Sequence, residues 1–279
     1  MSRSVRWVGA CLLALIGLVA CAPAEENLAV VANAPGTFAV GEEQRLLVGL
    51  VDTETADFLA SPDLVTRAVI TSPDEVQTDT DAEFIWTVPE IVGIYLIRHT
   101  FEQAGTWWVS LRPSGYGSTP PAAFMVTSSD PVPGPGDPAP AVTTRTLKDH
   151  PIEEISSDDD PDPAFYQLSV DQALAEGKPL VVVFATPAFC VSQTCGPMLD
   201  QVKAAAADHP GANYIHVEIY RNLDAASTED LVIDPAVSAW GLPSEPWVFV
   251  IDGGGRVAAR FEGAMLPSEL EQALAAVGA

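Results

Sequence analysis

The chain has 279 residues, 48% of them hydrophobic, and 38 acidic residues against 13 basic ones give a formal net charge of −25. Because this charge repels nucleic acid and anionic lipid headgroups, binding to either is excluded as a function. With only four cysteines, a disulfide-dense scaffold is excluded too, and the fold must be stabilised by hydrophobic burial.

The first 21 residues predict an export signal. Two arginines, Arg3 and Arg6, precede an apolar run over residues 7–20 that is short for a membrane span. The run ends in Leu-Val-Ala-Cys21, which resembles the bacterial lipobox. The resemblance implies a lipoprotein signal peptide over residues 1–21 and a diacylated, palmitate-bearing Cys21. An ordinary signal peptide with a chance cysteine is the alternative.

Export and lipidation would place the protein in the cell envelope, anchored by its lipid to a bacterial membrane and facing the extracytoplasmic side. Residues 22–27 would be a short tether. Since Cys11 leaves with the signal and Cys21 carries lipid, Cys190 and Cys195 are the thiols of the exported body. In an oxidising compartment two such thiols are expected to pair.

Residues 28–128 predict a β-sandwich domain. Seven short runs of alternating apolar residues are separated by turn-rich pieces, with no helical stretch of ten residues. The runs are LAVVA, QRLLVGLVD, TRAVITS, AEFIWTVP, GIYLIRHTF, GTWWVSLRP and AAFMVTSS. In the sixth run, Trp107 shares a face with Val109 and Leu111, so we expect it in the core and Trp108 partly covered.

The stretch IYLIRHTFEQAGTWWVSL resembles the closing strand pair of bacterial immunoglobulin-like modules, which implies a fold and no activity. A copper-binding sandwich is the alternative considered. This segment offers only His99 and Met125 as soft-metal ligands, so structural roles are favoured for both and no metal site is predicted.

Residues 129–163 differ in character from both flanks. They hold eight prolines and the acidic run Asp158 to Asp160. Such a composition favours an extended, self-repelling linker that contributes to no core and holds two domains apart.

Residues 164–279 predict an α/β sandwich with a mixed sheet. A capping box at Ser169 opens a short helix that stops at Gly177. A continuously apolar strand, a helix, a second strand, a hairpin turning at residues 252–255 and a helix capped at Ser268 follow. Their sequences are KPLVVVFAT, GPMLDQVKAAAADHPG, ANYIHVEIY, EPWVFVIDGGGRVAARFEG and LPSELEQALAAVGA.

This order resembles a thioredoxin-like domain, and three local matches support the likeness. An apolar strand runs into a cysteine at the start of a helix, and Pro197 precedes MLDQV as the kinking proline does in thioredoxins. The stretch WGLPSEPWVFVIDGGGRVAARFEG is similar to the family segment whose cis-proline faces the active-site cysteines. The resemblance implies that Pro246 is this proline, because an arbitrary X-Pro bond is rarely cis.

The sequence also departs from the family. In the ungapped register the two family cysteine positions hold Phe189 and Ser192, whereas this chain has four residues between Cys190 and Cys195. The buried acidic residue that assists proton transfer in many thioredoxins falls at Val183.

The spacing of the two cysteines restricts where they can lie. On a regular helix their Cα atoms would be about 8.6 Å apart, whereas a disulfide tolerates at most about 6.8 Å. Either the sulfurs do not bond, or Cys190 precedes the helix and Cys195 lies in its first turn. Ser192 as the N-cap favours the second arrangement, which would place Cys190 beside the positive end of the helix dipole.

Two functions follow from these residues. The first is a membrane-anchored thiol-disulfide oxidoreductase, in which Cys190 attacks, Cys195 resolves and Pro246 shapes the groove that receives the partner chain. Its partners would be exported protein thiols and disulfides or a membrane redox partner, and no cofactor is required. The second is a non-catalytic binding or scaffold lipoprotein with a structural Cys190–Cys195 disulfide.

Two further alternatives have less support. Metal delivery, as in exported copper chaperones of the same fold, uses a CxxxC pair and a distant histidine, whereas His209 and His216 here come soon after the helix. Peroxidase chemistry would require TPAFC to match the peroxiredoxin motif with one inserted residue. His216 is expected to lie on one face of a strand.

Overall fold

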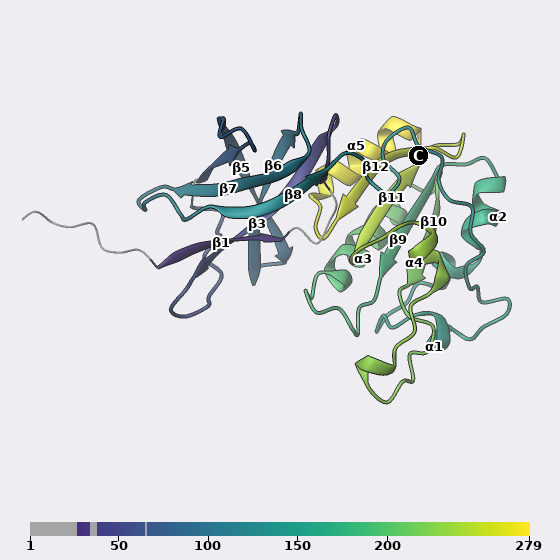
Figure 1. Ribbon diagram of the computed structural model, residues 1–279. Helices are drawn as coiled ribbons and strands as arrows, with labels where there is room; N and C mark the ends of the chain where they lie inside the picture. Colours follow the sequence, from purple (N-terminus) through teal and green to yellow (C-terminus); the bar gives the residue numbers. More distant parts are fainter. Residues whose placement is uncertain (1–26, 34–37, 65) are drawn as a thin grey trace, which may run out of the picture.

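The computed structural model describes residues 27–33, 38–64 and 66–279. Within them the strands form an eight-stranded and a four-stranded sheet, which lie side by side in Figure 1. The signal peptide, Cys21 and nearly all of the tether fall outside the described residues. The division of the chain into two domains also stays a prediction. The two sheets are described below.

The larger sheet contains all seven predicted strands and a short additional one, β2. Its order is β1-β3-β6-β5-β4-β7-β8-β2. The bounds are β1 Leu28–Asn33, β2 Phe38–Ala39, β3 Glu43–Asp52, β4 Thr66–Thr71, β5 Gln77–Val88, β6 Val92–Thr100, β7 Gly105–Pro113 and β8 Ala122–Thr127. Strand β5 begins at Gln77, five residues before the predicted run, because polar residues Gln77–Asp81 pair with β4.

Strand β5 turns the larger sheet into a sandwich. Its first half pairs with β4 and its second half, from Glu83, pairs with β6, so the strand passes from one layer to the other. Leu46 and Ile97 from one layer pack with Ile70 and Leu111 from the other in a shared core. Trp107 is buried there and Trp108 is partly covered, as predicted.

The smaller sheet has the order β10-β9-β11-β12. Its strands are β9 Leu180–Ala185, β10 Asn213–Glu218, β11 Trp247–Ile251 and β12 Val257–Glu262. Strand β9 is parallel to β10 and antiparallel to β11, which confirms the predicted mixed sheet. Every residue of β9 is buried, as expected of a strand covered on both faces.

Helices cover both faces of the smaller sheet (Figure 1). Met198 of α3 and Leu270 of α5 pack on one face, and Val170 of α2 and Val237 of α4 pack on the other. The helices are α1 Ile152–Ile155, α2 Val170–Ala175, α3 Cys195–Asp208, α4 Pro235–Ala239 and α5 Pro267–Val277, with 3-10 turns η1 Pro163–Tyr166 and η2 Thr228–Asp230.

Capping agrees with prediction at α2 and differs at α5. The Gln172 side chain accepts a hydrogen bond from the Ser169 backbone N–H at 3.2 Å, as the predicted capping box requires. At α5 the N-cap is Leu266, two residues before the predicted Ser268. The Glu269 carboxylate accepts from the Leu266 N–H at 2.9 Å, and Pro267 occupies the first helical position, where no N–H is needed.

The expectation that residues 129–163 contribute to no core is wrong. Val132 is buried against β12 and its neighbours, and Ile155 is buried on the opposite face of the smaller sheet. The backbone N–H of Gly136 donates to the Val257 carbonyl at 2.8 Å. Single apolar residues between prolines are therefore enough to fasten an irregular segment to a sheet when their spacing matches its surface.

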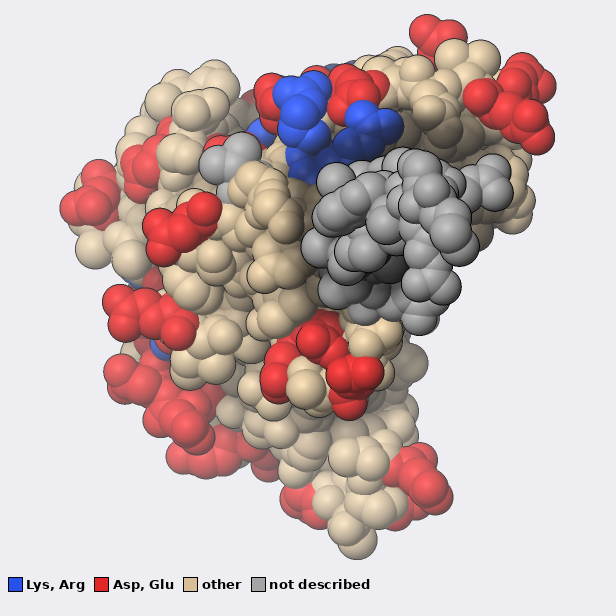
Figure 2. Space-filling view, turned by 90° about the vertical axis from the view of Figure 1, so that its left-hand side faces the viewer, with Lys and Arg blue, Asp and Glu red and all other residues tan. Residues whose placement is uncertain are grey.

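The two sheets also contact one another. Leu47 and Leu96 of the larger sheet pack with Ala264, in the connection that leads to α5. One face of the molecule carries scattered acidic side chains, with Lys and Arg gathered in one place (Figure 2). Among the residues described, no helix combines the length and apolar character needed to cross a membrane.

Candidate functional site

Cys190 and Cys195 form a disulfide with their Cα atoms 6.0 Å apart. Cys190 lies in the loop that follows β9, and Cys195 is the first residue of α3. This is the second of the two arrangements that the spacing allowed. The loop lets the two cysteines approach because Gln193 adopts a positive φ of 59°, which turns the chain sharply before the helix.

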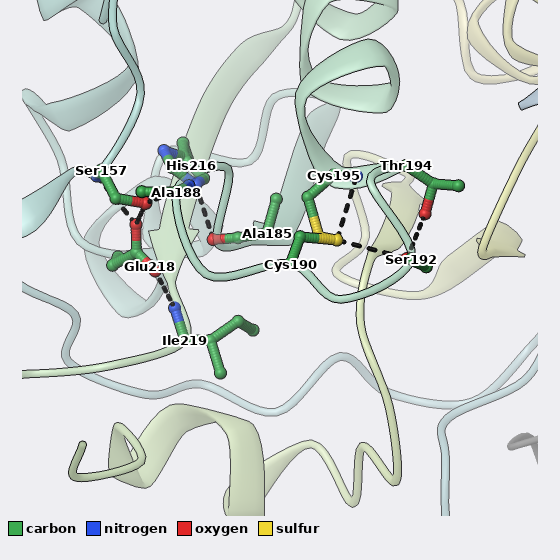
Figure 3. Close-up of a disulfide and its surroundings, with 10 residues drawn as sticks. All are labelled: Ser157, Ala185, Ala188, Cys190, Ser192, Thr194, Cys195, His216, Glu218 and Ile219. Atoms are coloured by element: carbon green, nitrogen blue, oxygen red, sulfur yellow. Dashed lines mark hydrogen bonds between the residues drawn. A yellow bond between two sulfur atoms is a disulfide. The ribbon is translucent and has the colours of Figure 1, made fainter. Parts of the chain in front are cut away.

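The Cys190 sulfur occupies the N-terminal end of α3 (Figure 3). The backbone N–H of Cys195 donates to Cys190 Sγ at 3.3 Å, and the Ser192 hydroxyl lies 3.2 Å from the same sulfur. The N-cap is Thr194 and not the predicted Ser192, and its side chain makes no capping hydrogen bond. The sulfur thus meets one of the free N–H groups that a capping side chain ordinarily satisfies.

The two sulfurs differ in exposure. Cys195 has no exposed surface and packs with Met198 and Leu199 in the core under α3. Cys190 is only partly buried, and the next residue, Val191, is 94% exposed. A molecule arriving from solvent therefore reaches Cys190 first.

Pro246 lies at the end of the sheet where the cysteine loop begins. The Glu245–Pro246 peptide bond is cis, as the resemblance implied. The next residue, Trp247, pairs with Phe184 of β9, and β9 ends one residue later at Ala185. The proline and the first turn of the loop thus share one edge of the fold.

A buried carboxylate, Glu218, is tied to the cysteine loop through Ser157. Glu218 is 2% exposed and ends β10, where it pairs with Ala185. Its Oε2 accepts from the Ser157 N–H at 2.8 Å and from the Ser157 hydroxyl at 2.6 Å. The Ser157 oxygen in turn accepts from the backbone N–H of Ala188 at 3.3 Å, two residues before Cys190 (Figure 3).

His216 holds the other end of the same turn. Its Nε2 lies 3.0 Å from the Ala185 carbonyl, which can only accept, so Nε2 carries a proton. Burial lowers the pKa of His216, an effect that the charge of Glu218 only partly offsets. Its Nδ1 lies 2.7 Å from the Tyr166 hydroxyl, which also bonds to the Ser156 hydroxyl at 2.8 Å. His216 lies on one face of β10, as expected.

Both cysteines and Pro246 were predicted site residues, and they stay a prediction, whereas Glu218 and Ser157 were not predicted. A signal for Glu218 was present, because alternation in YIHVEIY places His216 and Glu218 on one face of an otherwise apolar strand. Ser157 gave no such signal, since it lies in the segment interpreted as a linker. At Val183, where the resemblance places an acid, the neighbour across the ladder is His216.

Aromatic residues near the disulfide separate into core and surface. Trp247 and Trp240 are buried, as is Met198, so they form no exposed platform. Phe189 is partly exposed and its ring contacts that of Tyr220 with centroids 6.0 Å apart. Throughout the described ranges, no three His, Cys, Asp or Glu side chains gather as a metal site would require.

Several solved structures are similar to parts of this chain. A thio-disulfide isomerase from Thermus thermophilus is 21% identical over 52% of this chain and 97% of that chain, with a TM-score of 0.36. A thioredoxin-family thiol:disulfide interchange protein from Chlorobium tepidum TLS is 17% identical over 51% of this chain and 96% of that chain, with a TM-score of 0.33.

The filamin domain of Lin-41 is 18% identical over 38% of this chain and 98% of that chain, with a TM-score of 0.26. At these identities and TM-scores the likenesses carry no weight for activity. No protein-family model matches the chain, and neither does any curated protein.

Proposed function

We propose that this protein is a lipid-anchored, extracytoplasmic thiol-disulfide oxidoreductase whose working pair is Cys190 and Cys195. The observation that carries the proposal is the asymmetry of the pair: Cys190 is reachable from solvent and accepts a backbone N–H from the start of α3, while Cys195 is buried behind it. A helix N-terminus favours a thiolate over a thiol, and the thiolate is the attacking species.

The exchange needs only the two thiols and a partner disulfide. The Cys190 thiolate attacks one partner sulfur, the partner disulfide breaks, and the leaving sulfur departs as a thiolate that takes a proton from water. Cys195 then gives up its proton and attacks Cys190, which releases the second partner thiol. The partner has gained two electrons and the chain is left with its disulfide. The reverse sequence oxidises a partner dithiol.

The rest of the site supports this role by positioning. His216 and, through Ser157, Glu218 hold the turn that leads from β9 to Cys190. In the proposed location the partners are exported proteins with exchangeable cysteines or a membrane redox protein. The lipid anchor and the location rest on Leu-Val-Ala-Cys21 in the sequence.

A structural disulfide is the second candidate, and the full burial of Cys195 favours it. A bridge that closes so short a loop would stabilise the fold by about 2 kcal/mol through loop entropy. Such a staple would resist reduction, with a potential below about −300 mV.

The test is trapping with the full chain in detergent micelles. Cys195→Ser should accumulate a mixed disulfide when the reduced variant meets a disulfide-containing protein, because nothing then resolves the bond to Cys190. Cys190→Ser should form none, and the double variant is the matched control. Non-reducing electrophoresis after acid quenching measures the trapped species.

The two candidates give opposite results. If the wild-type pair is reduced only in denaturant and Cys195→Ser traps nothing, the disulfide is structural. Trapping by Cys195→Ser together with a potential in the range of exchange proteins, above about −270 mV, supports the oxidoreductase.

A further inference from the structure

A partly apolar rim lies beside the partly exposed Cys190. It consists of Phe189, Val191, Tyr220 and Ile233. Phe189 and Val191 flank Cys190 in sequence, Phe189 contacts the Tyr220 ring, and Tyr220 forms a backbone bridge with Ile233, which is 55% exposed. A chain that brings a disulfide to Cys190 therefore meets apolar side chains next to it.

Arg145 holds the rim in place. The guanidinium of Arg145 donates to the Tyr220 carbonyl at 2.7 Å and to the Arg221 carbonyl at 3.1 Å. Arg145 also forms an ion pair with Asp234 at 3.6 Å, just after Ile233. These contacts fasten both strands of the bridge, so the rim has a fixed shape before any partner arrives.

A carboxylate, Glu245, lies at the edge of the sheet where the cysteine loop begins, because it precedes cis-Pro246 and the pairing of Trp247 with Phe184. Its side chain is partly buried. Burial, and after it the charge of Glu245, raises the pKa of Tyr220. In the part of the chain that the structure describes, the Glu245 side chain makes no hydrogen bond and no ion pair. The arginines in this region are engaged elsewhere, Arg221 with Asp234 and Arg260 with Asp130.

The charge of Glu245 is therefore uncompensated. Burial, and after it the repulsion from Glu218, raises the pKa of the Glu245 carboxyl. Both effects mean that the ionised form lies in surroundings that disfavour it, and a cation brought to the same place would relieve both.

We propose that Glu245 selects partners in which the exchanging disulfide is flanked by a lysine or arginine and by an apolar residue. The cation would pair with Glu245 while the apolar residue lies on the rim of Phe189, Tyr220 and Ile233. This proposal rests on the proposed function, since it names the kind of exported polypeptide that the same two cysteines receive. Net acidity of the chain attracts such segments from a distance, and Glu245 aligns them at the sulfur.

The test compares two peptides of equal length. Each carries leucine and one cysteine linked by a disulfide to glutathione, with arginine beside the cysteine in one peptide and glutamate in the other. The reduced full chain becomes oxidised as it converts the peptide disulfide to two thiols, and the rate is followed by quenched alkylation. We expect the ion pair between its arginine and Glu245 to make the arginine peptide react roughly fivefold faster than it would without that pair.

The effect of Glu245 is isolated with a matched control. Glu245→Gln should lower the arginine-to-glutamate rate ratio roughly fivefold. Glu54→Gln removes one exposed charge from the turn after β3 and should leave the ratio unchanged, because it alters only the long-range field. Equal ratios in Glu245→Gln and wild type would overturn the proposal.

The pH dependence of the wild type gives a second readout. The pKa of Glu245 is raised, so its carboxylate gains a proton earlier than an ordinary glutamate as the pH falls. The groups facing it, Glu218 and Tyr220, are an acid and a phenol and supply no compensating cation. The rate ratio should therefore decrease from pH 7 to pH 5, whereas the thiolate fraction of Cys190 affects both peptides alike and cancels. A ratio independent of pH would overturn the proposal.

Failure of the proposed function is recognised separately with bis(2-hydroxyethyl) disulfide, which is neutral and has no flanking residues. If the reduced wild type does not react with it or with either peptide, the oxidoreductase itself fails and this inference fails with it. If it reacts with all three at rates that do not depend on charge, only the inference fails. Self-association that Glu245→Gln abolishes, seen by sedimentation, would identify a second copy as the occupant and also overturn the proposal.

Discussion

Arg45 and Glu269 are 224 residues apart in the chain and form a two-pronged ion pair, with Arg45 Nη2 2.8 Å from Glu269 Oε2 and Arg45 Nε 3.0 Å from Glu269 Oε1. Arg45 belongs to β3 of the larger sheet and Glu269 to the first turn of α5. Both side chains are largely buried. Arg98 of β6 donates to the same carboxylate, so one glutamate joins two strands of the sandwich to the helix.

Removing this carboxylate should destabilise the whole chain. Glu269→Ala leaves the Arg45 charge buried and without its partner, and it also removes the acceptor that caps α5, so we expect a loss of about 3 kcal/mol. Glu271→Ala, two residues along the same helix, removes only the more exposed pair with His209 and should cost less than about 1 kcal/mol. Urea unfolding of both variants measures the difference, and equal losses would contradict the buried-pair interpretation.

Residues 130–163 should resist proteolysis in the folded chain. Val132 and Ile155 are buried and the backbone is hydrogen-bonded to the smaller sheet, so the segment cannot enter a protease without local unfolding. Subtilisin should first cut elsewhere, in exposed turns such as residues 53–57. Mass spectrometry of early fragments is the measurement. Early release of two folded pieces by cuts within 130–163 would restore the linker hypothesis.

Ser157→Ala should loosen the turn before Cys190. The hydroxyl bridges the buried Glu218 carboxylate and the Ala188 N–H, so its loss should cost about 1 kcal/mol and speed amide exchange at Ala188 roughly tenfold. Ser244→Ala is the control, because Ser244 joins Glu262 to the Trp247 indole in the same way. It should cost similar stability and leave Ala188 exchange unchanged.

His216 should make the protein lose stability in mild acid. Its pKa is lowered in the folded state by burial, so below the ordinary histidine pKa of about 6.5 the unfolded chain takes up a proton that the folded chain does not. The free energy of unfolding should fall by up to about 1.4 kcal/mol per pH unit through this group. His216→Gln should reduce the slope between pH 7 and pH 5, measured by urea unfolding.

A second histidine provides a control of opposite sign. Hydrogen bonding to Glu271 raises the pKa of His209, so its protonation stabilises the folded state as the pH falls through the raised value. His209→Gln should therefore steepen the loss of stability in acid. If both substitutions change the slope in the same direction, the assignment of His216 as a neutral buried group is wrong.

Cys21→Ser should abolish lipidation. The wild-type chain, expressed in a bacterium that processes lipoproteins, should incorporate labelled palmitate and partition into the detergent phase. The serine variant should do neither, because the predicted lipidation attaches acyl chains through the sulfur of Cys21. Cys11→Ser, inside the signal, is the matched control and should label normally. Equal labelling of Cys21→Ser and wild type would exclude the lipobox interpretation.

The sequence predicted the parts of the fold that local patterns determine. The seven strands followed from alternation, and the limited reach of a disulfide left the position of Cys190 before the helix as one of two arrangements. The packing of Val132 could not be predicted, because composition indicates only the average tendency of a proline-rich segment and not which single side chain meets a groove. The pairing of Arg45 with Glu269 depends on how two sheets approach, which no local pattern records.

Glu218 illustrates an intermediate case. The strand that contains it was predicted, and its alternation puts the carboxylate on the same face as His216. What the sequence lacked was the neighbour: only the parallel pairing of β10 with β9 brings Glu218 beside Ala185, and only the packing of residues 150–160 brings Ser157 between them. Site residues that act through a second segment are therefore the hardest to identify from sequence.

The larger sheet also separates the start of β1 from the smaller sheet. Near one end of β3, Arg45 meets α5, and seven residues later Asp52 pairs with Leu28, the first residue of β1. A strand advances about 3.3 Å per residue, so these two points are separated by about 23 Å. Figure 1 shows β1 starting on the side away from the smaller sheet. With a lipid at Cys21, the sandwich would lie between the bilayer and the thiols. Only partners whose cysteines lie that far from the membrane could then exchange with them.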